Sequence, residues 1–383
     1  MATRTLYADS RSGGLRKPSC VAGTVDCAEV TPTKVHDKQS HRILLISIQP
    51  LIVRGRGCAS SKICKARTSG TRLDQFRRPV YVRGRMSQPP PSSSEPRIVD
   101  YENRDYRQYW QGADKQLEHQ HETKVLRELL PTASGWFLDL GCAHGRLLPL
   151  YDRTDRQIVM LDYSMVHIDM AAEKFAAPNH FFIAADAYRL PFKADIFNGL
   201  LSVRVFHHME KPDKAMDEVA RVLAPGGHAV IEYSNKRNLL RVLRYGAASF
   251  KQDHISYDGD MLFGTHPSYF AELAQRAHLV VRRSRGIGTY DQLVRHAPLL
   301  KKPGRVLEPV LDRTLGAMNL APSIFADVEK TGGQPAGAGT MLADILACPA
   351  CKSNLRDEQM QLACTSCGKS FPVRGRIYDF RIT

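Results

Sequence analysis

The sequence lacks the segments that carry a chain into or across a membrane. Its longest apolar run, Ile43 to Val53, is interrupted by Pro50 and is shorter than the roughly 20 apolar residues that span a bilayer as a helix. The N-terminus does not show the order of charged, apolar and small residues that forms a secretory signal peptide. We therefore predict a protein without a transmembrane segment and with a cytoplasmic location.

A disulfide framework is also missing. The nine cysteines are unevenly placed, and four of them lie close to the C-terminus as two narrowly spaced pairs. Paired spacing of this kind is typical of metal thiolates in a reducing compartment.

Acidic residues are scarce only at the beginning of the chain. Residues 1–85 contain 17 Lys and Arg against 5 Asp and Glu, and so carry +12 of the formal charge of +15. The rest of the chain is nearly neutral at +3. The net positive charge of the chain is therefore weak evidence for nucleic-acid binding.

Residues 1–85 show no sustained apolar period of a helix or a strand. They are rich in Arg, Ser, Gly and Thr, a composition that favours disorder, and we predict a disordered basic arm over residues 1–97. Transit peptides are also basic and Ser-rich, although four acidic residues before position 40 argue against one. A second hypothesis is that the native protein starts at Met86, just before a Pro/Ser run.

Beyond the arm, short apolar runs alternate with helical patterns. The predicted strands are 136–140, 157–161, 180–184, 196–202 and 228–233. The predicted helices are 118–130, 144–151, 165–175, 211–223 and 267–277. This alternation predicts an α/β fold with a doubly wound, mostly parallel sheet. We expect an insertion at 235–265, one or two edge strands within 278–295 and a linker near 332–339.

The stretch from Trp136 to Arg146 combines a strand with a glycine turn. It has neither the Gly-Lys-Ser/Thr of a P-loop nor the middle glycine of a dinucleotide-binding loop, because Ala143 occupies that position. Asp139, at the strand end, would repel a pyrophosphate and suits a cationic ligand group.

Two further acids, Asp162 and Asp186, follow the next two predicted strands. A carboxylate at the position of Asp162 can accept both hydroxyls of a ribose. Acids at three successive strand ends therefore fit a nucleoside with an amino-acid tail and no phosphate. The alternative is that these acids only cap helices and turns.

These segments resemble the class I S-adenosylmethionine-dependent methyltransferases, over about residues 100–325. The resemblance rests on four motifs in order: Leu138 to Gly145, Leu161 to Ser164, Ala185 to Ala187 followed by Leu-Pro-Phe, and Arg221 to Gly227. It implies a Rossmann-like fold and S-adenosylmethionine as the cofactor. The family usually has glycine where Ala143 stands. Because alanine does not easily take a positive φ, we expect an ordinary backbone region there.

The resemblance also implies roles for individual residues. Asp139 and the Gly141–Gly145 loop would hold the methionine part, Asp162 the ribose and Asp186 the adenine amino group. The backbone after the fourth strand would line the same pocket. The predicted cofactor-binding residues are Asp139, Gly141, Cys142, Gly145, Asp162, Tyr163, Asp186, Ala187, Val203 and Arg204.

The sequence does not need to contain a catalytic residue, since methyl transfer from a sulfonium depends largely on positioning. A general base is required only if the acceptor must lose a proton early. His207 and His208 are weak candidates for that base, and the alternative is that one caps a helix and the other is structural. Four aromatic residues before the first strand could close over the cofactor or simply pack: Tyr101, Tyr106, Tyr109 and Trp110.

The C-terminal cysteines form two Cys-x-x-Cys pairs, Cys348 with Cys351 and Cys364 with Cys367. Four thiolates at this spacing suit one structural zinc ion in a zinc ribbon, with an iron–sulfur cluster or a redox dithiol as alternatives. The last 39 residues or so resemble the small zinc-ribbon partner that activates tRNA and release-factor methyltransferases. That partner usually has an acidic residue where Arg374 stands. We expect a structural or docking role for the ribbon.

We predict four parts: a disordered arm at 1–97, a methyltransferase domain at 98–328, a linker at 329–341 and a zinc ribbon at 342–383. The expected activity is S-adenosylmethionine-dependent methyl transfer, with a small-molecule acceptor slightly favoured and loops 235–265 and 278–325 contributing the acceptor site. The alternatives are an RNA or protein methyltransferase that uses the ribbon to present its substrate, and a non-catalytic cofactor-binding scaffold. No Asn/Asp-Pro-Pro-Tyr/Phe motif follows the fourth strand. Methylation of amide or adenine nitrogens is therefore a less favoured prediction.

Overall fold

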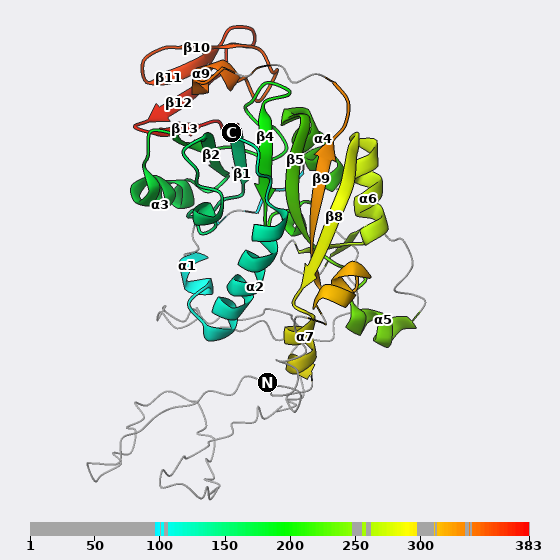
Figure 1. Cartoon of the computed structure of the whole chain (residues 1–383). Coiled ribbons are helices and arrows are strands. Elements are labelled where there is room, and N and C mark those ends of the chain that lie inside the picture. Colours follow the sequence, from blue (N-terminus) through cyan, green and yellow to red (C-terminus); the bar gives the residue numbers. More distant parts are fainter. Residues whose placement is uncertain are drawn as a thin grey trace, which may run out of the picture. The chain divides into compact units, whose positions relative to one another are not determined.

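A computed structural model of the chain describes residues 96–99, 101–102, 106–246, 255–257, 262–296, 310, 312–333, 337 and 339–382 (Figure 1). All of them belong to one compact unit, Tyr81–Thr383. The predicted arm and the proposed start at Met86 lie outside the described residues, apart from Pro96 and Arg97. Arg97 belongs to the fold, because its backbone N–H and its guanidinium both donate to Glu210, at 2.9 Å and 3.3 Å.

The main sheet has 11 strands in the order β10-β11-β12-β13-β3-β2-β1-β4-β5-β9-β8. The strands are β1 (Gly135–Leu140), β2 (Arg156–Asp162), β3 (His180–Ala184), β4 (Phe197–Ser202), β5 (Leu223–Ser234), β8 (Leu279–Ile287), β9 (Ser323–Lys330), β10 (Leu355–Asp357), β11 (Gln361–Cys364), β12 (Ser370–Arg374) and β13 (Ile377–Asp379). Strands β6 (Ile255–Tyr257) and β7 (Phe263–Thr265) form a separate pair.

The α-helices are α1 (Tyr106–Tyr109), α2 (Ala113–Leu129), α3 (Met165–Phe175), α4 (Pro212–Val222), α5 (Leu239–Tyr245), α6 (Pro267–Arg276), α7 (Thr289–His296) and α9 (Leu342–Ile345). Short 3-10 helices in the described part of the chain include η2 (Leu148–Leu150) and η3 (Phe206–His208). No helix in the described part of the chain combines the length and the apolar character that crossing a bilayer requires.

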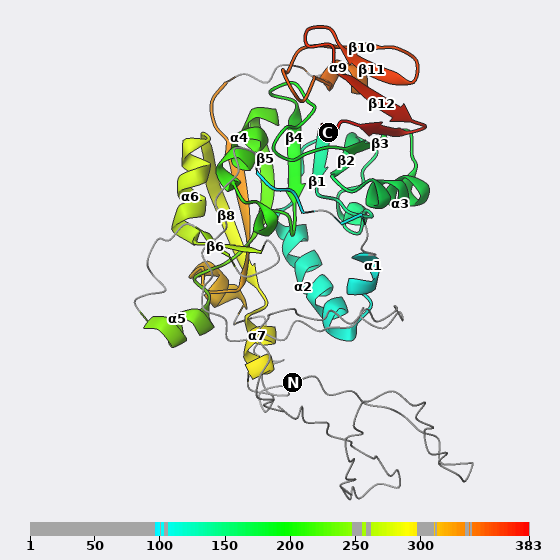
Figure 2. The same cartoon turned by 180° about the vertical axis from the view of Figure 1, so that it is seen from behind.

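The centre of the sheet is parallel, as the sequence predicts. Strands β3, β2, β1, β4 and β5 all run in one direction. Alternate residues of β1 point to opposite faces, so that Leu138 packs in the core on the α4 and α6 side and Phe137 in the core on the α2 and α3 side (Figure 2). The predicted doubly wound α/β architecture is confirmed.

The helix predicted at 144–151 is wrong. Only the 3-10 turn η2 forms there. Pro149 has no backbone N–H to donate, and Gly145 has a φ of +75°, which an α-helix does not accommodate. The chain therefore continues from the glycine loop as a series of turns.

The region after the fifth predicted strand contains more sheet than expected. Strand β9 pairs antiparallel with β5 and with β8, from Ser234↔Ser323 to His228↔Glu329 on the β5 side. It begins in the segment assigned to acceptor loops and ends inside the predicted linker 329–341. Its partners lie about 90 and 40 residues away, so the local sequence did not reveal the pairing.

The C-terminal zinc ribbon continues the methyltransferase sheet rather than standing apart. Strand β13 pairs in parallel with β3, and the N–H of Phe380 donates to the carbonyl of Ala184 at 2.7 Å. In the strand order β10 to β13 follow β3, and Figure 1 shows them on the side of the molecule away from β8. Leu346 and Phe371 of the ribbon are buried in the same apolar core as Phe192. The ribbon therefore derives stability from this shared core as well as from metal.

Candidate cofactor pocket and metal centre

A pocket opens at the carboxyl ends of β1, β2, β3 and β4. It is lined by nine of the ten residues predicted to bind the cofactor: Asp139, Gly141, Cys142, Asp162, Tyr163, Asp186, Ala187, Val203 and Arg204. The tenth, Gly145, is not among the described residues that line it. A Cβ on Gly145 would come within 2.9 Å of the Phe175 ring, so this glycine lets the loop pack against α3.

The loop after β1 has a left-handed backbone at three alternate positions. Gly141, Ala143 and Gly145 have φ values of +78°, +47° and +75°. The expectation of an ordinary conformation at Ala143 is therefore wrong. The N–H of Ala143 donates to a carboxylate oxygen of Asp162 at 2.8 Å, and this bond offsets part of the cost of the positive φ.

Asp139 lies at the bottom of the pocket and is 3% exposed. Burial raises its pKa to about 7, although the hydroxyl of Tyr151, which donates to the carboxylate, acts in the opposite direction. Among the described residues, Asp139 forms no salt bridge. A buried carboxyl group in this state would bind a cationic group by exchanging its proton for the cation.

The second and third acids, Asp162 and Asp186, accept hydrogen bonds from nearby backbone N–H groups. Asp162 accepts the N–H groups of Ala143 and Ser164, one on each oxygen, at 2.8 Å and 2.9 Å. A carboxylate can accept about four hydrogen bonds, so Asp162 keeps some capacity for a ligand. Asp186 accepts the N–H of Tyr188 at 2.8 Å. Both the predicted capping role and the predicted ligand role are thus compatible with the geometry.

Aromatic residues before β1 cover one side of the pocket. Tyr101 and Tyr106 line it, and the Tyr101 hydroxyl lies 2.7 Å from Nε2 of His208. Tyr106 stacks on Tyr109 at a centroid distance of 5.5 Å, and burial raises the pKa of Tyr106 far above its ordinary value. Residues Arg97 to Val99 also line the pocket, and the sequence pattern gave no indication of this.

A buried ionic network supports the fourth strand end. The guanidinium of Arg204 donates to Glu118 and, at 3.2 Å, to Glu122, which is completely buried. Arg146 also pairs with Glu122 and lies 3.8 Å from the centroid of the Trp110 ring. Burial raises the pKa of Glu122, but the hydrogen bond with His119 and the two guanidinium groups together bring it below its ordinary value. These acids lie on α2, and their role was not identified from the sequence.

The two histidine candidates line different cavities. His208 lines the cofactor pocket, whereas His207 lines a second cavity on the other side of Arg204. In that cavity, Nδ1 of His207 is 3.8 Å from Oε2 of Glu232. Glu232 is buried and was not identified from the sequence.

The ribbon reaches the rim of the cofactor pocket. Arg381 donates to Glu102 at 2.8 Å and to the carbonyl of Tyr163 at 3.5 Å. Glu102 in turn accepts the N–H of Met165, at the N-terminus of α3, at 2.8 Å. Glu102 lies next to Tyr101, so one contact connects the tail, the N-terminal segment and α3 at this rim.

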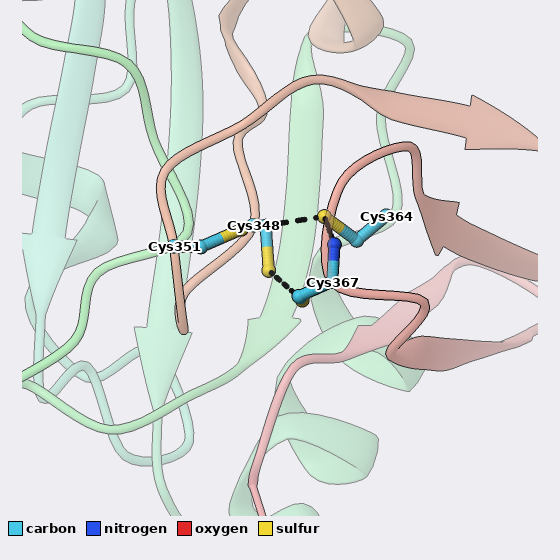
Figure 3. A group of neighbouring side chains, drawn as sticks. All are labelled: Cys348, Cys351, Cys364 and Cys367. Carbon is cyan, nitrogen blue, oxygen red and sulfur yellow. Dashed lines mark hydrogen bonds between the residues drawn. The ribbon is translucent and has the colours of Figure 1, made fainter.

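The four C-terminal cysteines form a compact group of thiols (Figure 3). Their sulfur atoms all lie within 4.8 Å of one another, with Cys348 and Cys367 3.7 Å apart and Cys351 and Cys364 3.4 Å apart. A tetrahedral zinc site with Zn–S bonds of about 2.3 Å requires sulfur atoms about 3.8 Å apart. The N–H groups of Ser366 and Cys367 donate to Sγ of Cys364 at 3.4 Å, so the set fits one zinc ion.

Two family models match the chain. Residues 138–231 match a methyltransferase domain, and residues 340–375 match the Trm112p-like proteins. The first match spans the strand ends that line the pocket, and the second includes all four cysteines.

Individual relatives match over shorter parts. The chain is 30% identical over 106 residues to a demethylmenaquinone methyltransferase of Clavibacter sepedonicus, covering 27% of this chain and 43% of that protein. It is 30% identical over 111 residues to the tRNA (carboxymethyluridine(34)-5-O)-methyltransferase of Mus musculus, covering 26% of this chain and 16% of that protein. The chain thus spans less than half the length of either relative.

Among solved structures, the chain resembles one in the complex between the Trm112 methyltransferase activator of Haloferax volcanii and a methyltransferase. The TM-score is 0.43 at 20% identity, covering 60% of this chain and 98% of that chain. The two domain matches and the cysteine cluster show what the chain contains: an S-adenosylmethionine-dependent methyltransferase domain joined to a Trm112p-like zinc-ribbon domain.

Proposed function

We propose that this protein transfers the methyl group of S-adenosylmethionine to a small-molecule acceptor. The observation that carries the proposal is the presence of three carboxyl groups, Asp139, Asp162 and Asp186, in one pocket at successive strand ends. The donor is a nucleoside with a cationic amino-acid tail and no phosphate, so its polar ends match acids at these positions.

We assign one role to each acid. Asp139 holds the ammonium group of the methionine part, because a buried carboxyl without a salt bridge gains most from a cation. Asp162 holds the ribose hydroxyls with its remaining lone pairs, and Asp186 accepts from the adenine amino group. The cofactor supplies an electrophilic methyl group when bound, and Tyr101 and Tyr106 keep water away from it.

The acceptor class is less closely defined by the relatives than the donor. One of them is named for a demethylated quinone and another for a tRNA uridine. A small molecule is favoured because the net positive charge of the ribbon is small. From Cys348 onward it has six Lys and Arg against three Asp and Glu, which is less than modules that bind a nucleic-acid backbone usually carry. The second candidate is an RNA or protein acceptor presented by the ribbon, which its Trm112p-like match favours.

We propose that the ribbon acts within this chain as a structural support of the cofactor pocket. The shared core, the β13–β3 pairing and the Arg381–Glu102 contact support this role. With β9 included, the methyltransferase domain would extend from about residue 97 to residue 330. We also propose a cytoplasmic location, which the zinc site supports because thiolates need a reducing compartment.

Calorimetry with S-adenosylmethionine tests the donor site in the full, zinc-loaded chain. We expect binding, and we expect Asp162→Ala to weaken it by at least tenfold. Asp169→Ala, an exposed acid on α3, is the matched control and should bind like the wild type. Absence of binding heat in the wild type would contradict the proposal.

A second experiment separates an enzyme from a scaffold. The full chain is incubated with methyl-labelled S-adenosylmethionine and fractionated host extract. Label in the organic-soluble fraction supports a small-molecule acceptor, and label in RNA or protein supports the second candidate. Cofactor binding without label in any fraction would favour a non-catalytic scaffold.

A further inference from the structure

A second cavity adjoins the cofactor pocket at the ends of β4 and β5. Arg204 lines both of them. The walls of the second cavity come from both segments expected to form acceptor loops, since Phe263 lies in the first and Ile287 in the second. Because it shares Arg204 with the donor pocket and is lined by the predicted acceptor segments, we take it as the candidate acceptor site.

The charged groups that face this cavity are mostly acidic. Glu118, Glu232 and Asp291 line it, and Arg204 is the one guanidinium among the described lining residues. That guanidinium is already bound, because it donates to Glu118 and Glu122. Among the described lining residues, an acceptor with a carboxylate or phosphate group would therefore meet like charges and no free cation that offsets them.

Glu232 is fixed in its charged form. Oε2 accepts the N–H of Arg204 at 2.9 Å, and Oε1 accepts the hydroxyl of Ser323 at 2.6 Å. Although burial raises the pKa of Glu232, the neighbouring His207 imidazole and these partners lower it to about 2. Glu232 therefore cannot take a proton from a substrate near neutral pH. Nδ1 of His207, 3.8 Å from Oε2 of Glu232, is the lining base that faces this carboxylate.

Resting on the function proposed above, we infer that the acceptor is an uncharged hydroxyl or amino group of a small molecule and that His207 receives its proton. The lone pair of the acceptor oxygen or nitrogen forms the bond to the methyl carbon. The carbon–sulfur bond of the sulfonium breaks, and its electrons remain on sulfur as a neutral thioether. The proton of the acceptor atom passes to the His207 imidazole, and Glu232 stabilises the resulting imidazolium.

The apolar part of the cavity agrees with a small ring-sized acceptor. Leu262, Phe263, Ile287 and Pro322 line it beside the hydroxyl groups of Ser234 and Ser323. Apolar walls with a few polar groups, beside these acids, bind and orient an uncharged molecule better than an anion.

The chemical stability of the labelled product tests the acceptor class. Host extract is labelled with the full chain and methyl-labelled S-adenosylmethionine, and the organic-soluble product is divided. We expect the label to resist mild alkali and to be released as methyl iodide by hot hydriodic acid, as methyl ethers and methylamines are. Release of labelled methanol by alkali would show a carboxyl ester and overturn the inference, as would label that stays bound to carbon.

Substitution of His207 tests its role. We expect His207→Asn to lower the turnover of the labelled fraction by at least about 100-fold. The calorimetric Kd for S-adenosylmethionine should stay within about twofold, because His207 lines the second cavity. His278→Asn is the control, since His278 is exposed and has a φ of +58° that asparagine tolerates.

The outcomes separate this inference from the function on which it rests. Turnover of His207→Asn within threefold of the wild type, with normal cofactor binding, would overturn the role of His207 and leave methyl transfer standing. Wild-type protein that binds the cofactor but labels no fraction would overturn the proposed function, and this inference with it.

Discussion

Nη1 of Arg381, in the ribbon tail, lies 2.8 Å from Oε1 of Glu102, in the segment that precedes the methyltransferase sheet. Glu102 accepts the N–H groups of Met165 and Val166, the first residues of α3. A carboxylate at a helix N-terminus is stabilised by the free N–H groups and the helix dipole, and Arg381 holds it there. This contact lies beside the end of β2, where Asp162 and Tyr163 line the cofactor pocket, and it is the contact through which we propose that the ribbon supports the pocket.

We therefore expect Arg381→Ala to weaken S-adenosylmethionine binding by about three- to tenfold, the effect of one charge-assisted hydrogen bond at a partly exposed site. Calorimetry of the zinc-loaded chain measures it. Arg376→Ala, at an exposed position in the same ribbon, should leave the Kd unchanged. Equal affinity of both variants and the wild type would show that the tail does not support the pocket.

The pKa of Asp139 predicts a pH dependence of cofactor binding. Burial raises this pKa to about 7, and an ammonium group requires the ionised form. Below pH 7 the cation must displace a proton, so affinity should fall by up to about tenfold per pH unit, and it should level off above about pH 7 until the amino group of the cofactor itself loses its proton. Calorimetric titrations from pH 5.5 to 8.5 measure the profile.

Two substitutions control this profile. Asp139→Asn should bind S-adenosylmethionine weakly, and its affinity should not change with pH near 7. Tyr151→Phe removes the hydroxyl that lowers the pKa of Asp139, so its acid limb should move to higher pH. A wild-type profile that is flat between pH 5.5 and 8.5 would contradict the assignment of Asp139 to the ammonium group.

Much of this site could be predicted from local sequence, and the reasons are physical. Strand β3 and helix α3 have the bounds expected from the sequence, because their apolar periods are regular and Ser164 caps the helix. The acids at the ends of β1, β2 and β3 meet in one pocket because parallel strands place their carboxyl ends at one edge. The cysteine pairs were predicted from their spacing alone.

What could not be predicted depends on contacts between distant residues. Arg381 and Glu102 are 279 residues apart, and Arg204 lies 82 residues from Glu122. Neither pair belongs to a local motif. Ala143 was expected to avoid a positive φ, and only the bond from its N–H to Asp162 explains why it does not. Strand β9 was missed because its pairing with β5 and β8 is not visible in its own sequence.

The lowered pKa of Glu232 predicts how the free energy of unfolding depends on pH. Its folded pKa of about 2 lies below the ordinary value of 4.5, so its charged form stabilises the fold above about pH 4.5 and this contribution is lost as the pH falls toward 2. The shift corresponds to roughly 3 kcal/mol at pH 7. Urea unfolding of the wild type and Glu232→Gln should show a difference of this order at pH 7 that shrinks by pH 3.

The control for this measurement is Glu173→Gln, an exposed position on α3, whose free energy of unfolding should match the wild type at each pH. A difference between wild type and Glu232→Gln that does not change with pH would show that Glu232 acts through packing and not through its charge.

Removal of zinc should affect the whole fold, because the ribbon shares its sheet and core with the methyltransferase domain. We expect Cys364→Ser to lose the one zinc per chain and to lower the Tm by at least about 5 °C in a single transition. Metal analysis and thermal unfolding measure both effects. Ser366→Ala, at an exposed position on the same knuckle, should keep the metal and the Tm.

Since β13 pairs with β3 beside the end of β2, cofactor affinity should fall together with zinc content. A zinc-free variant with the wild-type Tm and Kd would show that the shared core alone holds the ribbon in place.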